Sequence, residues 1–353
     1  MPARYKGKLG AGSGLATPIP GDMLALAQPT PTTFASLQKA VVVTAFDEPL
    51  AIHEVPVPAL PLEHHVVVKN LAVGVNPVDW KLKLYKFAIY SFPWINGREL
   101  SGVVVAAGLK LVIPVHELVV VLSTSYRDLT TLTFQEYTVV DSRLLWKLPH
   151  SLSVLLGASI GVGLTTAGVI MYNTFAIGYD ENLAGKTLVI YGGATVVGLY
   201  LVQLAKFHRA TVVAVALTEN EAYLTSLGVD QVIDRHLGAV EAALAALNVD
   251  YAVDCVSKQT LATLIDHTNA PQVCGIVGGI DNDRVKPVVI KQFHENFEFA
   301  LEFIQHTQRL LDDGTVKPVR TKVFSGGLAT VPTALAQLAG EGARGEKFVV
   351  TMR

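Results

Sequence analysis

A glycine-rich turn between an apolar run and a helix-like segment is the clearest chemical feature of the sequence. The apolar run 188–191 ends at Gly192 and Gly193, and the helix-like segment that follows has Gly198 near its start. Free N–H groups at a helix N-terminus bind phosphate oxygens, and glycine lets the backbone approach them closely. We predict a pyrophosphate site formed by Gly192, Gly193, Thr195, Val197 and Gly198.

Short apolar runs recur on the C-terminal side of this turn. They lie at 211–217, 231–233, 251–255 and 272–277, with helix-like segments between them. This alternation is typical of a parallel sheet covered by helices. We therefore predict a doubly wound Rossmann domain over residues 161–319.

The N-terminal part of the chain has a different pattern. Between residues 39 and 160, short β-prone runs are separated by prolines and glycines, which is typical of a barrel or sandwich. Two strand-like runs, 321–324 and 348–352, are expected to rejoin this first domain, so that residues 320–353 complete it. The fold class is α/β. Residues 1–38 are rich in Gly, Ala, Pro and Thr and are predicted to be a flexible tail.

Composition argues against several classes of protein. The 353 residues carry 28 basic and 30 acidic side chains, so we expect no nucleic-acid partner. Two cysteines, Cys255 and Cys274, are too few for a four-cysteine zinc site and fit a cytoplasmic compartment. Segment 151–179 has no charged side chain, but its glycines and hydroxyls favour a buried helix over a membrane span. Three basic residues in the tail leave weak peripheral membrane association open.

Six short motifs occur in order along the chain. They are Asn-Pro-Val-Asp at 76–79, Gly-Arg-Glu-Leu-Ser-Gly at 97–102, Phe-Gln-Glu-Tyr at 134–137, Gly-Leu-Thr-Thr-Ala-Gly at 163–168, Gly-Thr-Val-Lys-Pro at 314–318 and Gly-Glu-Lys-Phe-Val at 345–349. Together they resemble the medium-chain dehydrogenase/reductase superfamily, in its zinc-independent quinone-oxidoreductase and enoyl-reductase branch. The resemblance covers residues 39–353 and implies a GroES-like catalytic domain beside the Rossmann domain.

The zinc-dependent branch of that superfamily would place a cysteine at Asn76 and a histidine at Arg98. Neither residue is a thiolate or an imidazole, and His64 and His65 point to opposite faces of a strand, so we expect no metal. Without a Lewis acid, a conjugated carbonyl suits the site. Hydride attack on its β-carbon needs only hydrogen-bond stabilisation of an enolate.

The resemblance also implies roles for individual residues. Asn76 and Asp79 would lie at the edge of the cleft, although both are ordinary turn residues beside a proline. Tyr85 or Tyr90 could donate to the enolate oxygen, although tyrosine is more often a half-buried core residue. These four residues are the predicted catalytic set. Further cofactor contacts are predicted from Thr165, Thr166, Arg235, Gly278 and Lys347.

The predicted cofactor is NADP(H). The second Rossmann run ends without the acidic residue that binds the ribose in NAD enzymes. Arg235 is the nearest candidate partner for a 2′-phosphate, although Glu219 and Glu221 would repel that group. Thr195 replaces a glycine of the usual turn, and its hydroxyl could bond a phosphate oxygen.

We predict a metal-free NADPH-dependent oxidoreductase, monomeric or homodimeric, that reduces an enone, enoyl or quinone-like small molecule. A rival hypothesis is a non-catalytic dehydrogenase-fold factor in trafficking of the plasma-membrane proton ATPase, because two of the motifs also resemble the fungal AST-like branch. A third is a nucleotide-binding sensor without turnover. Thr195 and the acidic turn at Glu219 and Glu221 favour both rivals.

Overall fold

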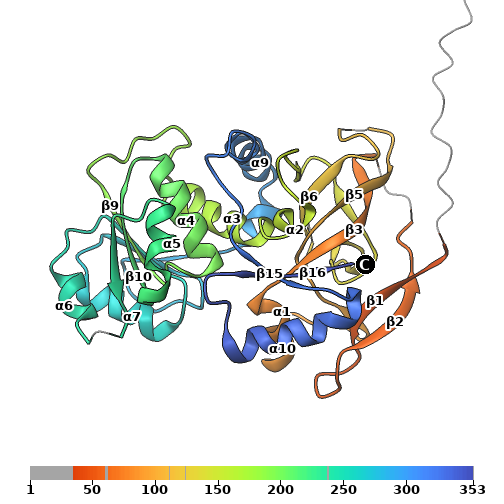
Figure 1. The fold of residues 1–353 in the computed structure, drawn as a ribbon, viewed down its shortest axis with the longest axis horizontal. Coiled ribbons are helices and arrows are strands. Elements are labelled where there is room, and N and C mark those ends of the chain that lie inside the picture. The colour runs from red at the N-terminus through yellow and green to blue at the C-terminus, as the bar shows by residue number, and fades with distance from the viewer. Residues whose placement is uncertain (1–34, 60–62, 111, 124, 237, 353) are drawn as a thin grey trace, which may run out of the picture. The chain divides into compact units, whose positions relative to one another are not determined.

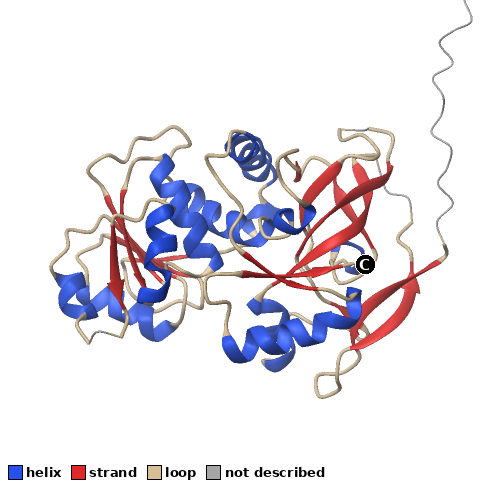
Figure 2. Cartoon of the chain, viewed as in Figure 1, coloured by secondary structure: helices blue, strands red, loops and turns tan. Residues whose placement is uncertain are grey.

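Two large sheets and one small sheet form the framework of the computed structural model (Figures 1 and 2). The structure describes the chain from residue 35 to residue 352, except for 60–62, 111, 124 and 237. The predicted tail therefore lies almost wholly outside the described residues. Strand β1 (Leu37–Val43) already begins within its last two positions.

The second half of the chain forms a parallel sheet of six strands. The first five in chain order follow the predicted sequence runs, whereas the last, Val285–Pro287, was not predicted. Its strands are β9 (Thr187–Tyr191), β10 (Thr211–Ala216), β11 (Gln231–Asp234), β12 (Tyr251–Asp254), β13 (Gln272–Gly275) and β14 (Val285–Pro287). Their spatial order is β11-β10-β9-β12-β13-β14, and every neighbouring pair is parallel. This is the doubly wound Rossmann order, with its switch point between β9 and β12. The predicted fold class is confirmed.

Helices cover both faces of this sheet, because consecutive side chains of each strand point to opposite faces. Leu188 and Ile190 of β9 pack in one core with helices on their side, whereas Val189 belongs to the core on the other side. The first group of helices is α4 (Val196–Phe207) and α5 (Glu221–Ser226); the second is α6 (Val240–Ala245) and α7 (Lys258–His267). Helix α9 (Phe297–Asp312) shares the core of the first group but contacts the strand Leu145–Lys147 of the other sheet. Apolar residues on both sides of the strands explain why the runs are continuous rather than alternating.

The first half of the chain forms a mostly antiparallel sheet. Its strands are β3 (His65–Val75), β5 (Glu99–Ala107), β6 (Leu118–Leu122), β7 (Tyr137–Asp141), β8 (Leu145–Lys147), β15 (Thr321–Phe324) and β16 (Lys347–Thr351). The C-terminal strand β16 pairs antiparallel with β3, so the end of the described chain lies in the sheet of the first half. The small sheet contains β1, β2 (Ala51–Pro56) and β4 (Trp94–Ile95). Helices α1 (Pro77–Leu84) and α10 (Val331–Glu341) contact one another. The proposed domain boundaries stay a prediction.

The uncharged segment forms a broken helical run, consisting of α2 (Val154–Gly157), α3 (Gly161–Gly168) and a π-helical turn (Val169–Thr174). By length and composition alone, Val154–Thr174 could cross a membrane, but 78% of its most apolar stretch is buried inside the protein. A Cβ atom at Gly168 would overlap the ring of Phe303 in α9, and one at Gly163 would lie 2.6 Å from Val196 of α4. The glycines therefore permit close helix packing.

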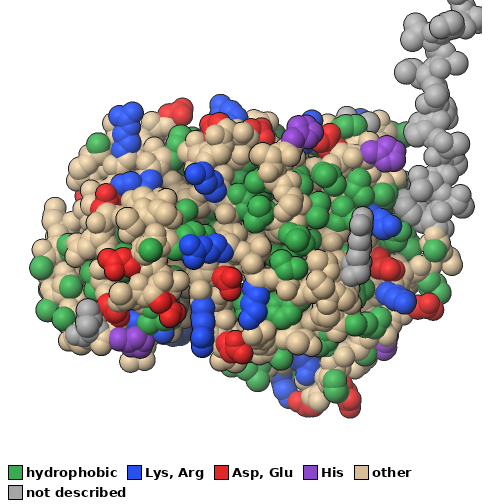
Figure 3. Space-filling model, in the orientation of Figure 1, with side chains coloured by type: hydrophobic (Ala, Val, Ile, Leu, Met, Phe, Trp, Pro, Cys, Tyr) green, Lys and Arg blue, Asp and Glu red, His purple; other side chains and the backbone are tan. Residues whose placement is uncertain are grey.

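Charged side chains of both signs are interspersed on the face seen in Figure 3, with apolar side chains between them. This distribution accords with the net charge of −2.

Candidate functional site

The predicted phosphate-binding turn lies at the switch point of the parallel sheet. Gly192 follows β9 and has a φ of +84°, in the left-handed region that favours glycine. A Cβ at Gly198 would lie 2.5 Å from the carbonyl oxygen of Gly192 and 2.7 Å from that of Gly193. Helix α4 therefore begins directly against the turn, with the unpaired N–H groups of its first turn at the switch point.

Thr195 is the N-cap of α4. Its hydroxyl oxygen accepts a hydrogen bond from the N–H of Gly198 at 3.1 Å. The residue that departs from the usual glycine pattern thus has a local role in starting the helix. Val197 lies in the first turn of the same helix and is partly buried.

Arg235 lies beside the end of β10, where the ribose of a dinucleotide binds in this fold. Its backbone N–H donates to the carbonyl of Ala216 at 3.0 Å, and its side chain is exposed. Glu219 and Glu221 follow β10 and are also exposed. The structure therefore brings the predicted cation and the two predicted repelling carboxylates to the same edge of the sheet.

Gly278 follows β13 at the same edge and also has a left-handed φ, of +77°. A Cβ there would lie 2.7 Å from Cε of Lys258, the first residue of α7. Sequence reasoning missed Lys258. Its only signal was its position just after the strand β12, where ligands bind in doubly wound sheets.

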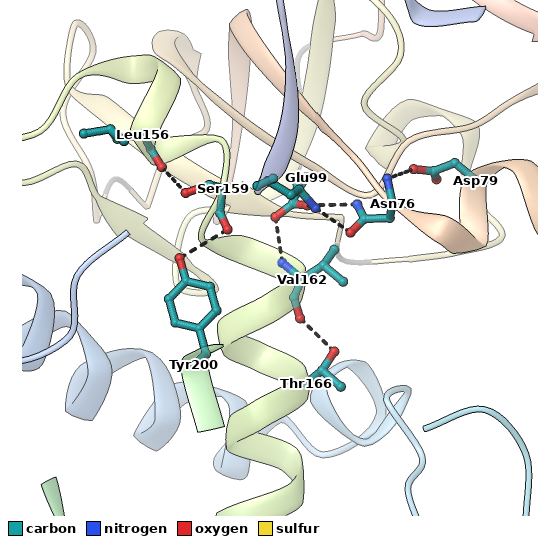
Figure 4. A network of polar contacts seen from close by, with 9 residues as sticks. Asn76, Asp79, Glu99, Leu156, Ser159, Val162, Thr166 and Tyr200 are labelled. Carbon is teal, nitrogen blue, oxygen red and sulfur yellow. Dashed lines mark hydrogen bonds and ion pairs between the residues drawn. The ribbon is translucent and has the colours of Figure 1, made fainter. Parts of the chain in front are cut away.

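Three buried polar side chains and one backbone N–H form a hydrogen-bonded group, which we name the Glu99 network and which connects both halves of the chain (Figure 4). It consists of Asn76, Glu99, Val162 and Lys347. Oε1 of Glu99 accepts from Nδ2 of Asn76 at 2.8 Å and forms an ion pair with the ammonium of Lys347. Oε2 accepts from the N–H of Val162 in α3 at 2.8 Å, and Lys347 donates to Oδ1 of Asn76 at 2.6 Å. Asn76 and Lys347, predicted as catalytic and cofactor residues, are thus both held in the interior.

Two threonines of α3 differ in how their hydroxyls are used. The hydroxyl of Thr166 donates to the carbonyl of Val162 at 2.7 Å, inside its own helix (Figure 4). Thr165 is fully buried, and its hydroxyl has no hydrogen-bond partner among the described residues. Of the pair, Thr165 has the hydroxyl that a ligand could use.

A second buried group, which we name the Arg98 cluster, contains Asp79, Arg98, Tyr126 and His294. The guanidinium of Arg98 lies 4.1 Å from the centroid of the Tyr126 ring, and the His294 ring meets that ring edge-on, with centroids 4.6 Å apart. Within the described chain, Nη1 of Arg98, Oδ1 of Asp79 and both ring nitrogens of His294 are buried without a hydrogen-bond partner.

Burial determines the protonation of this cluster. It raises the pKa of Asp79 to about 6, although the positive charge of Arg98 opposes the shift. It lowers the pKa of His294 to about 4, with Arg98 adding to the effect. It also raises the pKa of the Tyr126 phenol to about 12. Near neutral pH the cluster therefore holds a permanent cation, a neutral imidazole, a neutral phenol and a carboxyl group that titrates close to pH 6.

The two predicted catalytic tyrosines are largely exposed. Tyr85 is 63% exposed and Tyr90 is 57% exposed. Their rings pack near Trp80 and Trp94, and the guanidinium of Arg127 lies 5.1 Å from the centroid of the Tyr90 ring. Neither tyrosine contacts a member of the Arg98 cluster through a hydrogen bond or ring contact in the described chain, and the catalytic role of both stays a prediction. Tyr126 and His294 carried no motif that sequence reasoning could have recognised.

Comparison with known families agrees with both halves of the fold. The family model for the alcohol dehydrogenase GroES-like domain matches residues 62–150, and the model for the zinc-binding dehydrogenase matches residues 196–300. The chain belongs to the medium-chain dehydrogenase/reductase superfamily. The first match includes three members of the Arg98 cluster, and the second includes His294 and helix α4.

Relatives within the superfamily include fungal enoyl reductases. The trans-enoyl reductase himH of Aspergillus japonicus is 32% identical over 201 residues, and the match covers 55% of this chain and 59% of that protein. The trans-enoyl reductase sthE of Phaeosphaeria nodorum is 26% identical, with 86% of this chain and 93% of that protein covered. An alcohol dehydrogenase superfamily protein from Novosphingobium aromaticivorans has the same fold, with a TM-score of 0.77, 22% identity, and coverage of 90% and 100%.

The residues of this superfamily member do not fit a catalytic zinc ion. At the two positions considered for zinc ligands, the amide oxygen of Asn76 accepts from the Lys347 ammonium and Arg98 carries a guanidinium. Two fixed cations oppose a divalent cation, and neither side chain is a good zinc donor. Within the part of the chain that the structure describes, no three His, Cys, Asp or Glu side chains are grouped as metal ligands.

Proposed function

We propose that the protein is an NADPH-dependent, metal-free reductase of conjugated carbonyl compounds, such as enones, enoyl compounds or quinones. The observation that carries the proposal is the turn at Gly192 and Gly193 packed against Gly198 at the switch point of a doubly wound sheet. Dinucleotides bind at that place in this fold. The names of the fungal relatives, trans-enoyl reductases, support the substrate class.

The cofactor, when bound, supplies the hydride. The N–H groups at the start of α4 would hold its pyrophosphate, and the exposed Arg235 would pair with a 2′-phosphate. Thr165 offers a buried hydroxyl that has no partner among the described residues. Asp79, whose pKa is about 6, can release a proton close to neutral pH.

A titration with NADPH and NADH, followed by intrinsic fluorescence, tests the proposal. We expect NADPH to bind more tightly, and Arg235→Ala to reduce that preference about ten- to a hundredfold, because a charged hydrogen bond is lost. Gly198→Ala should abolish binding of both cofactors, because its Cβ would meet two carbonyl oxygens. Gly340→Ala is the matched control, because outside its own helical turn no atom of the described residues lies within 4 Å of the added carbon.

Circular dichroism must confirm that each variant is folded. Wild-type protein that binds neither cofactor at millimolar concentration would refute the proposal and favour the trafficking factor. Binding without turnover of any conjugated acceptor would favour the sensor. Four further statements stay predictions: the cytoplasmic location, the oligomeric state, the weak membrane association and the resemblance to the fungal AST-like branch.

A further inference from the structure

Arg98 is a buried arginine whose guanidinium forms no hydrogen bond or close ion pair within the described chain. The residue is only 3% exposed, and its Nη1 has no hydrogen-bond partner among the described residues. No carboxylate of the described chain forms an ion pair with the guanidinium. Arginine keeps its proton under all ordinary conditions, so the charge cannot be relieved by titration. Burying an unpaired charge is costly, and such groups are normally paired.

The contacts that Arg98 does make leave its polar edge unused. The Tyr126 ring covers one face of the guanidinium at 4.1 Å, which stabilises the cation without using its hydrogen-bond donors. Asp79 interacts with Arg98 electrostatically, but its Oδ1 is itself without a partner. A planar donor group supported on one face by an aromatic ring is suited to bind a planar, two-oxygen anion.

Neighbouring groups favour the same ligand. The imidazole of His294 is neutral near pH 7, so one of its two unpartnered nitrogens carries a hydrogen that can be donated. Tyr126 and His294 are partly exposed, whereas the unpartnered nitrogens of His294 and Nη1 of Arg98 are themselves buried. Glu99 and Lys347 also act electrostatically on Asp79, but their charges are paired with one another.

We propose that Arg98 binds a carboxylate on the substrate, so that the compound reduced is an α,β-unsaturated acid or another conjugated acceptor that carries a carboxylate. The assignment of this ligand as a substrate rests on the proposed function, whereas the binding of the carboxylate does not. Arg98 then acts as a specificity-determining residue, and Asp79 weakens the anion's binding while it is ionised.

The test is a ligand-observed NMR titration of the cofactor-free protein with trans-2-butenoate. Its neutral counterpart trans-2-butenamide has nearly the same shape, and inorganic phosphate serves as a different anion. The variants are Arg98→Met, Asp79→Asn and Arg127→Met. Arg127 is the matched control, because it is an exposed arginine of the same loop as Tyr126 that stacks on a different ring, that of Tyr90.

We expect trans-2-butenoate to bind the wild-type protein. Arg98→Met should weaken the binding of trans-2-butenoate at least tenfold, and Asp79→Asn should tighten that binding. Arg127→Met should leave the binding of trans-2-butenoate unchanged. The affinity of the wild-type protein for trans-2-butenamide should be no higher than the affinity of Arg98→Met for trans-2-butenoate. Equal binding of acid and amide, unchanged binding in folded Arg98→Met, or phosphate binding as tight as the acid would overturn the proposal. Carboxylate binding without NADPH binding would refute the proposed function alone, and NADPH binding without carboxylate binding would refute this inference alone.

Discussion

The Glu99 network and the Arg98 cluster are two buried polar groups that differ in one respect. Arg98 and Glu99 are adjacent in sequence, and Asn76 and Asp79 share one turn, so the same short segments contribute to both. The carboxylate and amide oxygens of the Glu99 network are bonded within the protein. Three members of the Arg98 cluster instead present buried polar atoms without partners.

This difference separates a scaffold from a site. A satisfied buried network rigidifies the elements it connects, here β5, the start of α1, the start of α3 and β16. Buried polar groups left unsatisfied reduce stability, and strain, a catalytic role or a bound water or ion commonly explains them. We infer that the Glu99 network holds the two halves of the chain in place, and that the Arg98 cluster faces the ligand.

Breaking the Glu99 network should give the largest loss of stability. Lys347→Met leaves the fully buried carboxylate of Glu99 without its cation, and we expect unfolding free energy to fall by about 3–5 kcal/mol. Urea denaturation measures this change. The control is Lys186→Met, which breaks an exposed ion pair with Asp250 and should cost less than about 1 kcal/mol. Similar losses in the two variants would contradict the scaffold role.

Asp79 should give a smaller effect that depends on pH. Burial raises its pKa to about 6, well above its ordinary value, so the folded protein binds this proton more tightly than the unfolded chain does. Its contribution to stability is fully present below about pH 4 and is lost as pH rises through about 6, with a total change on the order of 3 kcal/mol. The difference in unfolding free energy between wild type and Asp79→Asn should follow that curve. A difference that is constant from pH 4 to pH 7 would mean that Asp79, like the Glu99 network, has its polar atoms satisfied within the protein.

Removing Arg98 should give the smallest change in stability. The guanidinium makes no hydrogen bond or ion pair with the described chain, so Arg98→Met deletes a buried charge and loses only the contact with the Tyr126 ring and the electrostatic interaction with Asp79. We expect the free energy of unfolding to stay within about 1 kcal/mol of wild type or to rise. A loss as large as that of Lys347→Met would mean that Arg98 belongs to the scaffold.

The sequence was sufficient for features that depend on local order. The glycines at 192, 193 and 198 and the alternation of apolar runs predicted the Rossmann sheet, because a turn and a strand–helix repeat are set by neighbouring residues. The apolar segment was likewise predicted to be a buried helix. Its glycines accommodate Phe303 and Val196, partners that no local pattern could have named.

The candidate site could be predicted only in part, because its contacts are long-range. Asn76 and Lys347 are 271 residues apart in the chain, so no spacing rule could show that the Lys347 ammonium donates a hydrogen bond to the Asn76 side chain. Arg98 was noticed only as a departure from a metal-binding pattern. Tyr126 is brought to it by a loop and His294 by the short helix α8 (Gln292–Glu295). Tyr85 and Tyr90 were chosen for their phenols, but burial, which determines whether a phenol is useful, is a property of the folded chain.

The oxidation of NADPH, followed at 340 nm with a panel of conjugated acceptors, tests the central claim most directly. We expect wild-type protein to oxidise NADPH only when an acceptor is present, and acceptors with a carboxylate to react best. Folded Arg98→Met should raise KM for those acceptors at least tenfold while its affinity for NADPH is unchanged. Wild-type protein that binds NADPH but shows no acceptor-dependent oxidation, or a variant with unchanged KM, would contradict the account.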